Sequence, residues 1–120
     1  MLEILQIELE LFETFHAITQ NVVNYLPDEP EFPLIHVESI ERNIWLHKPL
    51  TLEVEMKIGL YALGHSNKGI LEFAEEVLQA IAKLNYPQRI EENIVAQVKN
   101  DLWCNDITLK IWTTHKEGEL

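Results

Sequence analysis

The sequence predicts an α+β fold in which a mainly antiparallel sheet of about four strands carries two helices on one face, in the order α-β-β-α-β-β. Two segments repeat apolar residues at helical spacing. A segment between them alternates apolar and polar residues, as a half-buried strand does. The connections between expected strands resemble hairpins, which join antiparallel neighbours. With 120 residues, 47% of them hydrophobic, the chain is expected to form a single domain over residues 1–120.

The first helix is predicted from Leu2 to about Asn24, because apolar residues occupy a broad arc of its circumference. Glu3, Glu10 and Glu13 fall on the opposite side, whereas Glu8 falls inside the apolar arc without an evident reason. The following segment, 27–33, contains three prolines, which exclude regular structure there. It leads into a strand predicted from Leu34 to Glu41.

The clearest strand is predicted from Leu50 to Leu63. Its apolar positions alternate with a more polar set, namely Thr51, Glu53, Glu55, Lys57, Gly59 and Tyr61. This period of two predicts one buried face and one more polar face. The residues between the first two strands, 42–49, are expected to form a long hairpin connection.

The second helix follows a turn at Gly64 and is expected to be capped by Ser66 or Asn67. Apolar residues at helical spacing carry it to Leu84. Two further strands are predicted, about 94–103 and 107–114, with a turn at 104–106. In that arrangement Trp103 and Trp112 would flank the hairpin and pair across it.

The charge of the chain is strongly acidic and unevenly distributed. Nine Lys and Arg residues against twenty Asp and Glu residues leave a formal charge of −11, and residues 1–41 contain nine acids and no base. Tight binding to a phosphate backbone needs a basic patch, so sequence-specific nucleic-acid binding is not expected. The acidity either maintains solubility or steers the chain towards a basic protein partner.

The motifs of catalysis and cofactor binding do not match this chain. Residues 64–69 lie between a strand and a helix like a nucleophile elbow, but the second glycine comes one residue late. The five histidines have no metal-site spacing, and Cys104 is the only cysteine. We expect no enzyme activity, no cofactor and no metal. Without a signal-peptide pattern or a long apolar run, we expect a soluble protein made in a cytoplasm that does not enter a membrane.

Aromatic and apolar residues in the expected hairpin loop stand out. Ile44, Trp45 and Leu46 are adjacent in a region with no predicted core of its own. Tryptophan is common as an anchor of protein interfaces. Either this loop folds back on its own domain, or it forms part of a subunit contact.

Several diffuse patterns together resemble the family of phage tail-terminator or tail-completion proteins, which also occurs in prophages and gene transfer agents. The resemblance covers most of the chain. It lies in the amphipathic first helix, the proline-rich segment 28–37, the strand Leu50 to Leu63, the loop 64–69, the helix to Leu84 and the last strand from Ile107 to Trp112.

This resemblance implies a structural role in a virion tail, at the neck, after assembly in the host cytoplasm. Family members form a ring, typically a hexamer, on the last ring of the tail tube and present a surface to the head connector protein. A ring built head to tail needs two different complementary surfaces. The candidate interface residues for these contacts are Glu3, Glu10, Glu13, Ile44, Trp45, Leu46, Glu53, Glu55 and Tyr61.

A different class of function is also compatible with the sequence. The acidic first third would suit a non-enzymatic binding module, for example an inhibitor that mimics DNA and acts on a basic host protein. Binding that weakens strongly with salt would distinguish this module from a tail subunit.

Overall fold

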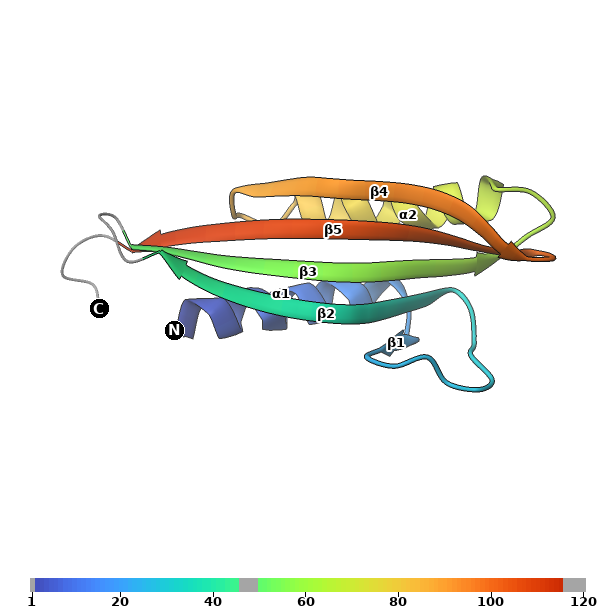
Figure 1. The fold of residues 1–120 in the computed structure, drawn as a ribbon, viewed down its shortest axis with the longest axis horizontal. Helices are drawn as coiled ribbons and strands as arrows, with labels where there is room; N and C mark the ends of the chain where they lie inside the picture. Colours follow the sequence, from blue (N-terminus) through green and yellow to red (C-terminus); the bar gives the residue numbers. More distant parts are fainter. Residues whose placement is uncertain (1, 46–49, 116–120) are drawn as a thin grey trace.

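The computed structural model describes residues 2–45 and 50–115, which form a long sheet with two helices along it (Figure 1). The molecule measures 54 × 22 × 20 Å along its principal axes. The elements in chain order are α1 (Leu2–Ile18), β1 (Val22–Val23), β2 (Leu34–Trp45), β3 (Leu50–Leu63), α2 (Lys68–Ala82), β4 (Gln88–Lys99) and β5 (Leu102–His115).

The sheet has five strands in the order β1-β2-β3-β5-β4. β1 runs parallel to β2, whereas the other neighbours are antiparallel, so the sheet is mixed. The prediction of a mainly antiparallel sheet of about four strands, in the order α-β-β-α-β-β, was therefore wrong. The observed order is α-β-β-β-α-β-β.

The missed strand, β1, explains part of this error. Apolar Val22 continued the helical pattern in the sequence, but α1 ends at Ile18. Thr19 then donates a side-chain hydrogen bond to the carbonyl of Pro33 (2.8 Å), and the amide of Ile35 donates to the carbonyl of Asn21 (2.8 Å). These contacts with a distant segment set the chain beside β2. A two-residue strand is too short to carry a periodic pattern of its own.

The C-terminal hairpin also differs from the prediction. Its turn lies between Lys99 and Leu102, where Asp101 has a positive φ of 60°, a conformation that Asp tolerates better than most residues. Cys104 and Asn105, expected in a turn, are buried within β5. Trp103 and Trp112 lie on the same strand, so they do not pair across a hairpin. The turn was misplaced because β4, whose residues from 89 to 99 all belong to the exposed class, has no clean alternation of apolar and polar residues.

The connection between β2 and β3 is shorter than the predicted loop of residues 42–49. β2 continues through 42–45 to end at Trp45, so these residues are strand and not loop. Leu46, the remaining residue of the expected loop cluster, lies outside the described residues.

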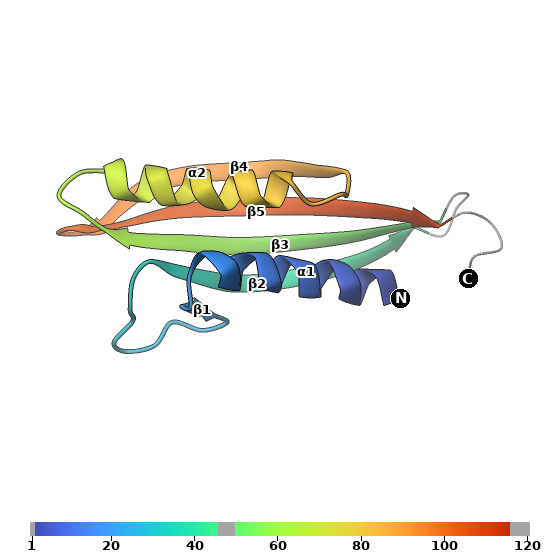
Figure 2. The ribbon, with the colours of Figure 1, turned by 180° about the vertical axis from the view of Figure 1, so that it is seen from behind.

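The hydrophobic core lies between the two helices and one face of the sheet. Both helices lie behind the sheet in Figure 1 and in front of it in Figure 2, so they cover the same face. Buried residues at helical spacing point from α1 and α2 onto alternate residues of β3 and β5. These core residues are Ile7, Leu11 and Phe15; Ile70, Phe73, Ala74, Val77 and Ile81; Leu52, Val54, Met56, Ile58 and Leu60; and Ile107, Leu109 and Ile111.

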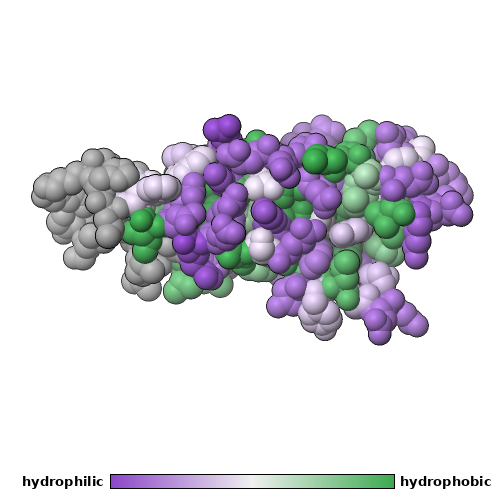
Figure 3. All heavy atoms as spheres, in the orientation of Figure 1, coloured by the Kyte–Doolittle hydropathy of each residue, from purple (hydrophilic) through white to green (hydrophobic). Residues whose placement is uncertain are grey.

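Among the described residues, no helix lies on the opposite face of the sheet, which is called the open face below. Hydrophilic side chains cover much of it, and apolar patches are interspersed, several of them over the half of the molecule where β4 turns into β5 (Figure 3). Within residues 2–45 and 50–115, neither helix has the length and apolar character needed to cross a membrane.

Candidate assembly surfaces

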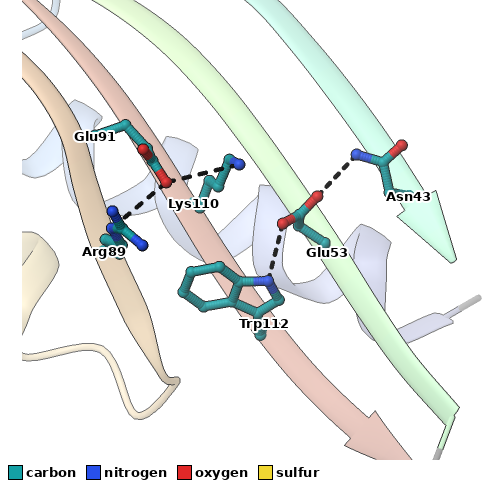
Figure 4. A network of polar contacts seen from close by, with 6 residues as sticks. All are labelled: Asn43, Glu53, Arg89, Glu91, Lys110 and Trp112. Atoms are coloured by element: carbon teal, nitrogen blue, oxygen red, sulfur yellow. Dashed lines mark hydrogen bonds and ion pairs between the residues drawn. The ribbon is translucent and has the colours of Figure 1, made fainter. Parts of the chain in front are cut away.

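A buried carboxylate on the open face ties three strands together. Glu53 of β3 is only 6% exposed. Its carboxylate accepts hydrogen bonds from Nδ2 of Asn43 on β2 (2.8 Å) and from Nε1 of Trp112 on β5 (2.9 Å) (Figure 4). Residues 43 and 112 lie directly opposite residue 53 in the two ladders. Glu53, predicted as an interface residue, therefore has its acceptors satisfied within the subunit.

A second polar cluster joins β4 to β5 on the same face. Glu91 lies 3.5 Å from Nε of Arg89 and 3.6 Å from Nζ of Lys110 (Figure 4). Arg89 and Lys110 are directly opposite each other, so Glu91 offsets the repulsion between two like charges. The Arg89 side chain remains 68% exposed. Arg89 therefore presents a positive charge at this edge of the sheet.

The ring of Tyr61 lies against the backbone of β3 at Gly59. A Cβ added to Gly59 would stand 3.0 Å from Cε2 of Tyr61 and 3.1 Å from Oε1 of Glu38. Burial raises the pKa of Tyr61, and the carboxylates of Asp106 and Glu38 raise it further. The phenol is therefore neutral at physiological pH and belongs to an acidic corner of the open face.

The predicted acidic residues of α1 have different surroundings. Glu10 accepts a hydrogen bond from Nε2 of Gln6 (3.2 Å). Burial raises the pKa of Tyr86, and the hydrogen bond and charge of Glu10 raise it further. Glu13 is exposed. The side chain of Glu3 lies outside the described part of the chain. Because α1 is on the helix-covered face, the structure does not bring these acids together with Glu53, Glu55 and Tyr61.

Ile44 and Trp45 lie at the end of β2, where their side chains are 40% and 49% exposed. The N-terminal part of α1 lies at the same end of the molecule and exposes Leu5 and Leu9 (Figure 1). A tryptophan left half exposed at the end of a strand remains a candidate contact residue.

The sequence reasoning missed the surface around β4. Every residue from Arg89 to Lys99 is exposed, including the apolar residues Ile90, Ile94, Val95 and Val98. On the helix side, a groove of about 450 Å³ separates β4 from α2 and is lined by Leu71, Ala74, Leu78 and Val95 among others. The signal in the sequence was a set of apolar residues in this segment that do not keep the period of two expected of a strand with one buried face.

The residues with possible chemical roles are engaged in structural contacts. Oγ of Ser66 accepts a hydrogen bond from the amide of Lys68 (3.3 Å), and Nδ1 of His65 lies 3.0 Å from Oδ1 of Asp101 at the surface. Burial and the charge of Asp106 raise the pKa of Cys104, which keeps the thiol protonated. No group of three or more His, Cys, Asp or Glu residues suited to a metal ion occurs among the residues the structure describes.

Comparison with known proteins shows similarity in fold. No protein-family model matches the sequence, and no curated protein matches it. Among solved structures, a chain in the "Virion of native gene transfer agent (GTA) particle" superimposes with a TM-score of 0.56. The superposition covers 88% of this chain and 92% of that chain, at 9% sequence identity. The similarity therefore extends over nearly the whole of both folds.

Proposed function

We propose that this chain is a structural subunit of a phage-like particle and that copies of it form a ring that terminates the tail tube. The observation that carries the proposal is the shared fold with a chain of a gene transfer agent virion, over 88% and 92% of the two chains. The resemblance of the sequence to tail-terminator proteins points in the same direction. The tail tube protein and the head connector protein are the proposed partners, and the neck of the tail is the proposed location.

The electrostatics of the chain are compatible with this role. A ring at the neck must let DNA pass without gripping it. A formal charge of −11 disfavours condensation on a phosphate backbone, because binding there depends on releasing counterions from basic contacts.

The shape of the sheet supports assembly from identical subunits. Its two lateral edges belong to different strands, β4 on one side and β2 with the short β1 on the other. A head-to-tail ring requires two different surfaces on each subunit, and the two edges provide them.

Light scattering across a wide concentration range, combined with electron microscopy of the same samples, tests the proposal. We expect a species with the mass of a closed ring, sharp in distribution and reversible on dilution. A mass of one chain at every concentration would contradict ring formation by this protein.

A second candidate function is an acidic binding module for a basic host protein. The observation in its favour is the concentration of nine acids and no base in residues 1–41. Such a module would bind a basic partner with an affinity that falls steeply between low and high salt. A ring-sized mass together with weak, salt-insensitive binding to basic proteins would count against it.

A further inference from the structure

We infer that the β4 edge of one copy pairs with the β2 edge of a second copy, antiparallel, so that the sheet continues from subunit to subunit. The inference rests on the proposed self-assembly and names the surfaces that would carry it. The occupant of the β4 edge is a second copy of this chain, because the complementary edge is found on the same molecule.

Both strands have an unpaired edge. Among the described residues β4 pairs only with β5, and every residue from 89 to 99 belongs to the exposed class. β2 pairs with β3 along one edge, and along its other edge β1 pairs only with Ile35 and His36. Among the described residues, no strand therefore pairs with this second edge from Ser39 to Trp45.

When two copies stand level, the stretch 88–92 of β4 faces Ser39 to Arg42 of the second copy, and the pairing is confined to this stretch because β1 already pairs with Ile35 and His36 farther along β2. Segment 88–92 contains no proline to block pairing, and its apolar residue Ile90 is 37% exposed. Exposed apolar edges of this kind readily pair with another strand.

The direction of the strands suits this pairing. Each step across β2, β3, β5 and β4 reverses direction, so β4 runs opposite to β2 within one subunit. If a second copy lies beside the first in the same orientation, its β2 runs antiparallel to the β4 of the first copy. Antiparallel pairing is slightly more stable per residue than parallel pairing.

A row of charges across the open face gives the register. Following the pairings from edge to edge, Glu41 is opposite Glu55, Glu55 is opposite Lys110, and Lys110 is opposite Arg89. One row therefore carries two negative charges at the β2 edge and two positive charges at the β4 edge. When two copies stand level, Arg89 of the first adjoins Glu41 of the second, and each like-charge pair gains an opposite charge beside it.

The adjacent row of residues, on the helix-covered face, is apolar from one edge of the sheet to the other. Ile40, Met56, Leu109 and Ile90 follow one another across the sheet in the same way. Level copies therefore place exposed Ile90 against half-buried Ile40. The same register thus joins opposite charges on the open face and apolar side chains on the helix face.

Charge reversal tests the register. We expect Arg89→Glu and Glu41→Arg each to raise the concentration needed for half-assembly by about threefold or more, and the double variant to restore it, since opposite-charge cross-strand pairs contribute measurably. Lys99→Glu is the matched control. It makes the same charge change on the same strand, but Lys99 lies opposite Leu102 and beyond the start of β2, so it should not alter assembly. A double variant no better than the singles would overturn the register.

Disulfide trapping tests the contact directly. Opposed Cα atoms in an antiparallel ladder lie at distances that a disulfide can span. With Cys104 replaced by serine, a chain carrying Glu41→Cys and Arg89→Cys should oxidise into dimers, trimers and larger linked species. Each single-cysteine chain can form dimers at most, and a control pair of Glu13→Cys with Arg89→Cys should not form the series.

The two tests separate this inference from the proposed function. A ring-sized mass in solution without the linked series would leave the tail role standing and overturn the edge pairing. If the serine background proves unfolded, the charge-reversal series in the unmodified chain decides the question alone.

Discussion

Arg42 of β2 donates hydrogen bonds from both Nε and Nη2 to the carboxylate of Glu8 on α1, each at 2.6 Å. The two residues are 34 positions apart, and the Glu8 side chain is only 9% exposed whereas that of Arg42 is 48% exposed. The hydrogen bonds and the charge of Glu8 raise the pKa of Arg42. This pair explains why a glutamate lies within the apolar arc of the first helix.

Removing Arg42 should destabilise the fold, because the buried Glu8 carboxylate would lose both of its hydrogen bonds from Arg42. We expect Arg42→Met, which keeps most of the apolar stem, to lower the free energy of unfolding by about 1–2 kcal/mol, a value reduced for the solvent exposure of Arg42. Urea denaturation measures the change. The exposed pair Lys68–Glu72, at 3.8 Å, is the control. Lys68→Met should change stability by less than about 0.5 kcal/mol, and an equal loss in both variants would contradict this account.

The Glu53 network should respond to loss of one acceptor. Glu53→Gln leaves a single side-chain oxygen for two donors, Asn43 and Trp112, and turns an amide towards one of them. We expect a loss of about 1–3 kcal/mol, because a buried donor remains unsatisfied. Thermal unfolding followed by circular dichroism measures it. Glu55→Gln, on the same strand and face but half-buried, provides the comparison and should lose clearly less.

Gly59 should tolerate a side chain only when Tyr61 is shortened. We expect Gly59→Ala to cost about 1 kcal/mol, since its Cβ would crowd the Tyr61 ring at 3.0 Å. In the Tyr61→Ala background the same change should cost much less. A double-mutant cycle from urea denaturation gives the coupling. An equal cost in both backgrounds would show that the ring is not what limits this position.

The stability of the fold should fall in alkaline solution. Burial raises the folded pKa of Cys104 above 9.0 and that of Tyr61 above 10.0. The neutral forms are therefore favoured in the folded state, and their contribution is present below these ordinary values and lost as pH rises through the folded pKa values. We expect Tyr61→Phe to reduce the loss of stability as the pH rises above about 10. A variant as alkali-sensitive as the wild type would remove Tyr61 as a cause.

Trp45 should matter for assembly more than for folding. Its side chain is 49% exposed at the end of β2, so we expect Trp45→Ala to change the unfolding free energy by less than about 1 kcal/mol. Light scattering should show a weaker oligomer. Tyr25→Ala, which also removes an exposed aromatic ring, is the control for non-specific effects. An unchanged oligomer in the Trp45 variant would reject its assignment as a contact residue.

Much of the local structure was predictable because it follows from periodicity. The strand predicted from Leu50 to Leu63 has those bounds in the structure, since one of its faces is buried and the other is not. β4 was predicted from 94 and not from 88, because an edge strand exposed on both faces has no such alternation. The turn was misplaced because residues 104–106 have the composition of a turn. In the structure Asn105 is buried within β5 and donates hydrogen bonds to Oδ1 of Asn93 and to the carbonyl of Ile94.

Pairing between distant residues decided the candidate surfaces. The sequence by itself determined the acidic charge, the two amphipathic helices and the strand from Leu50 to Leu63, because each depends on residues near one another along the chain. Only the tertiary structure decided that Glu8 meets Arg42, that Glu53 is buried between Asn43 and Trp112, and that Glu41, Glu55, Lys110 and Arg89 form one row. Those relationships depend on the order and register of the strands, which long-range packing sets and local periodicity does not specify.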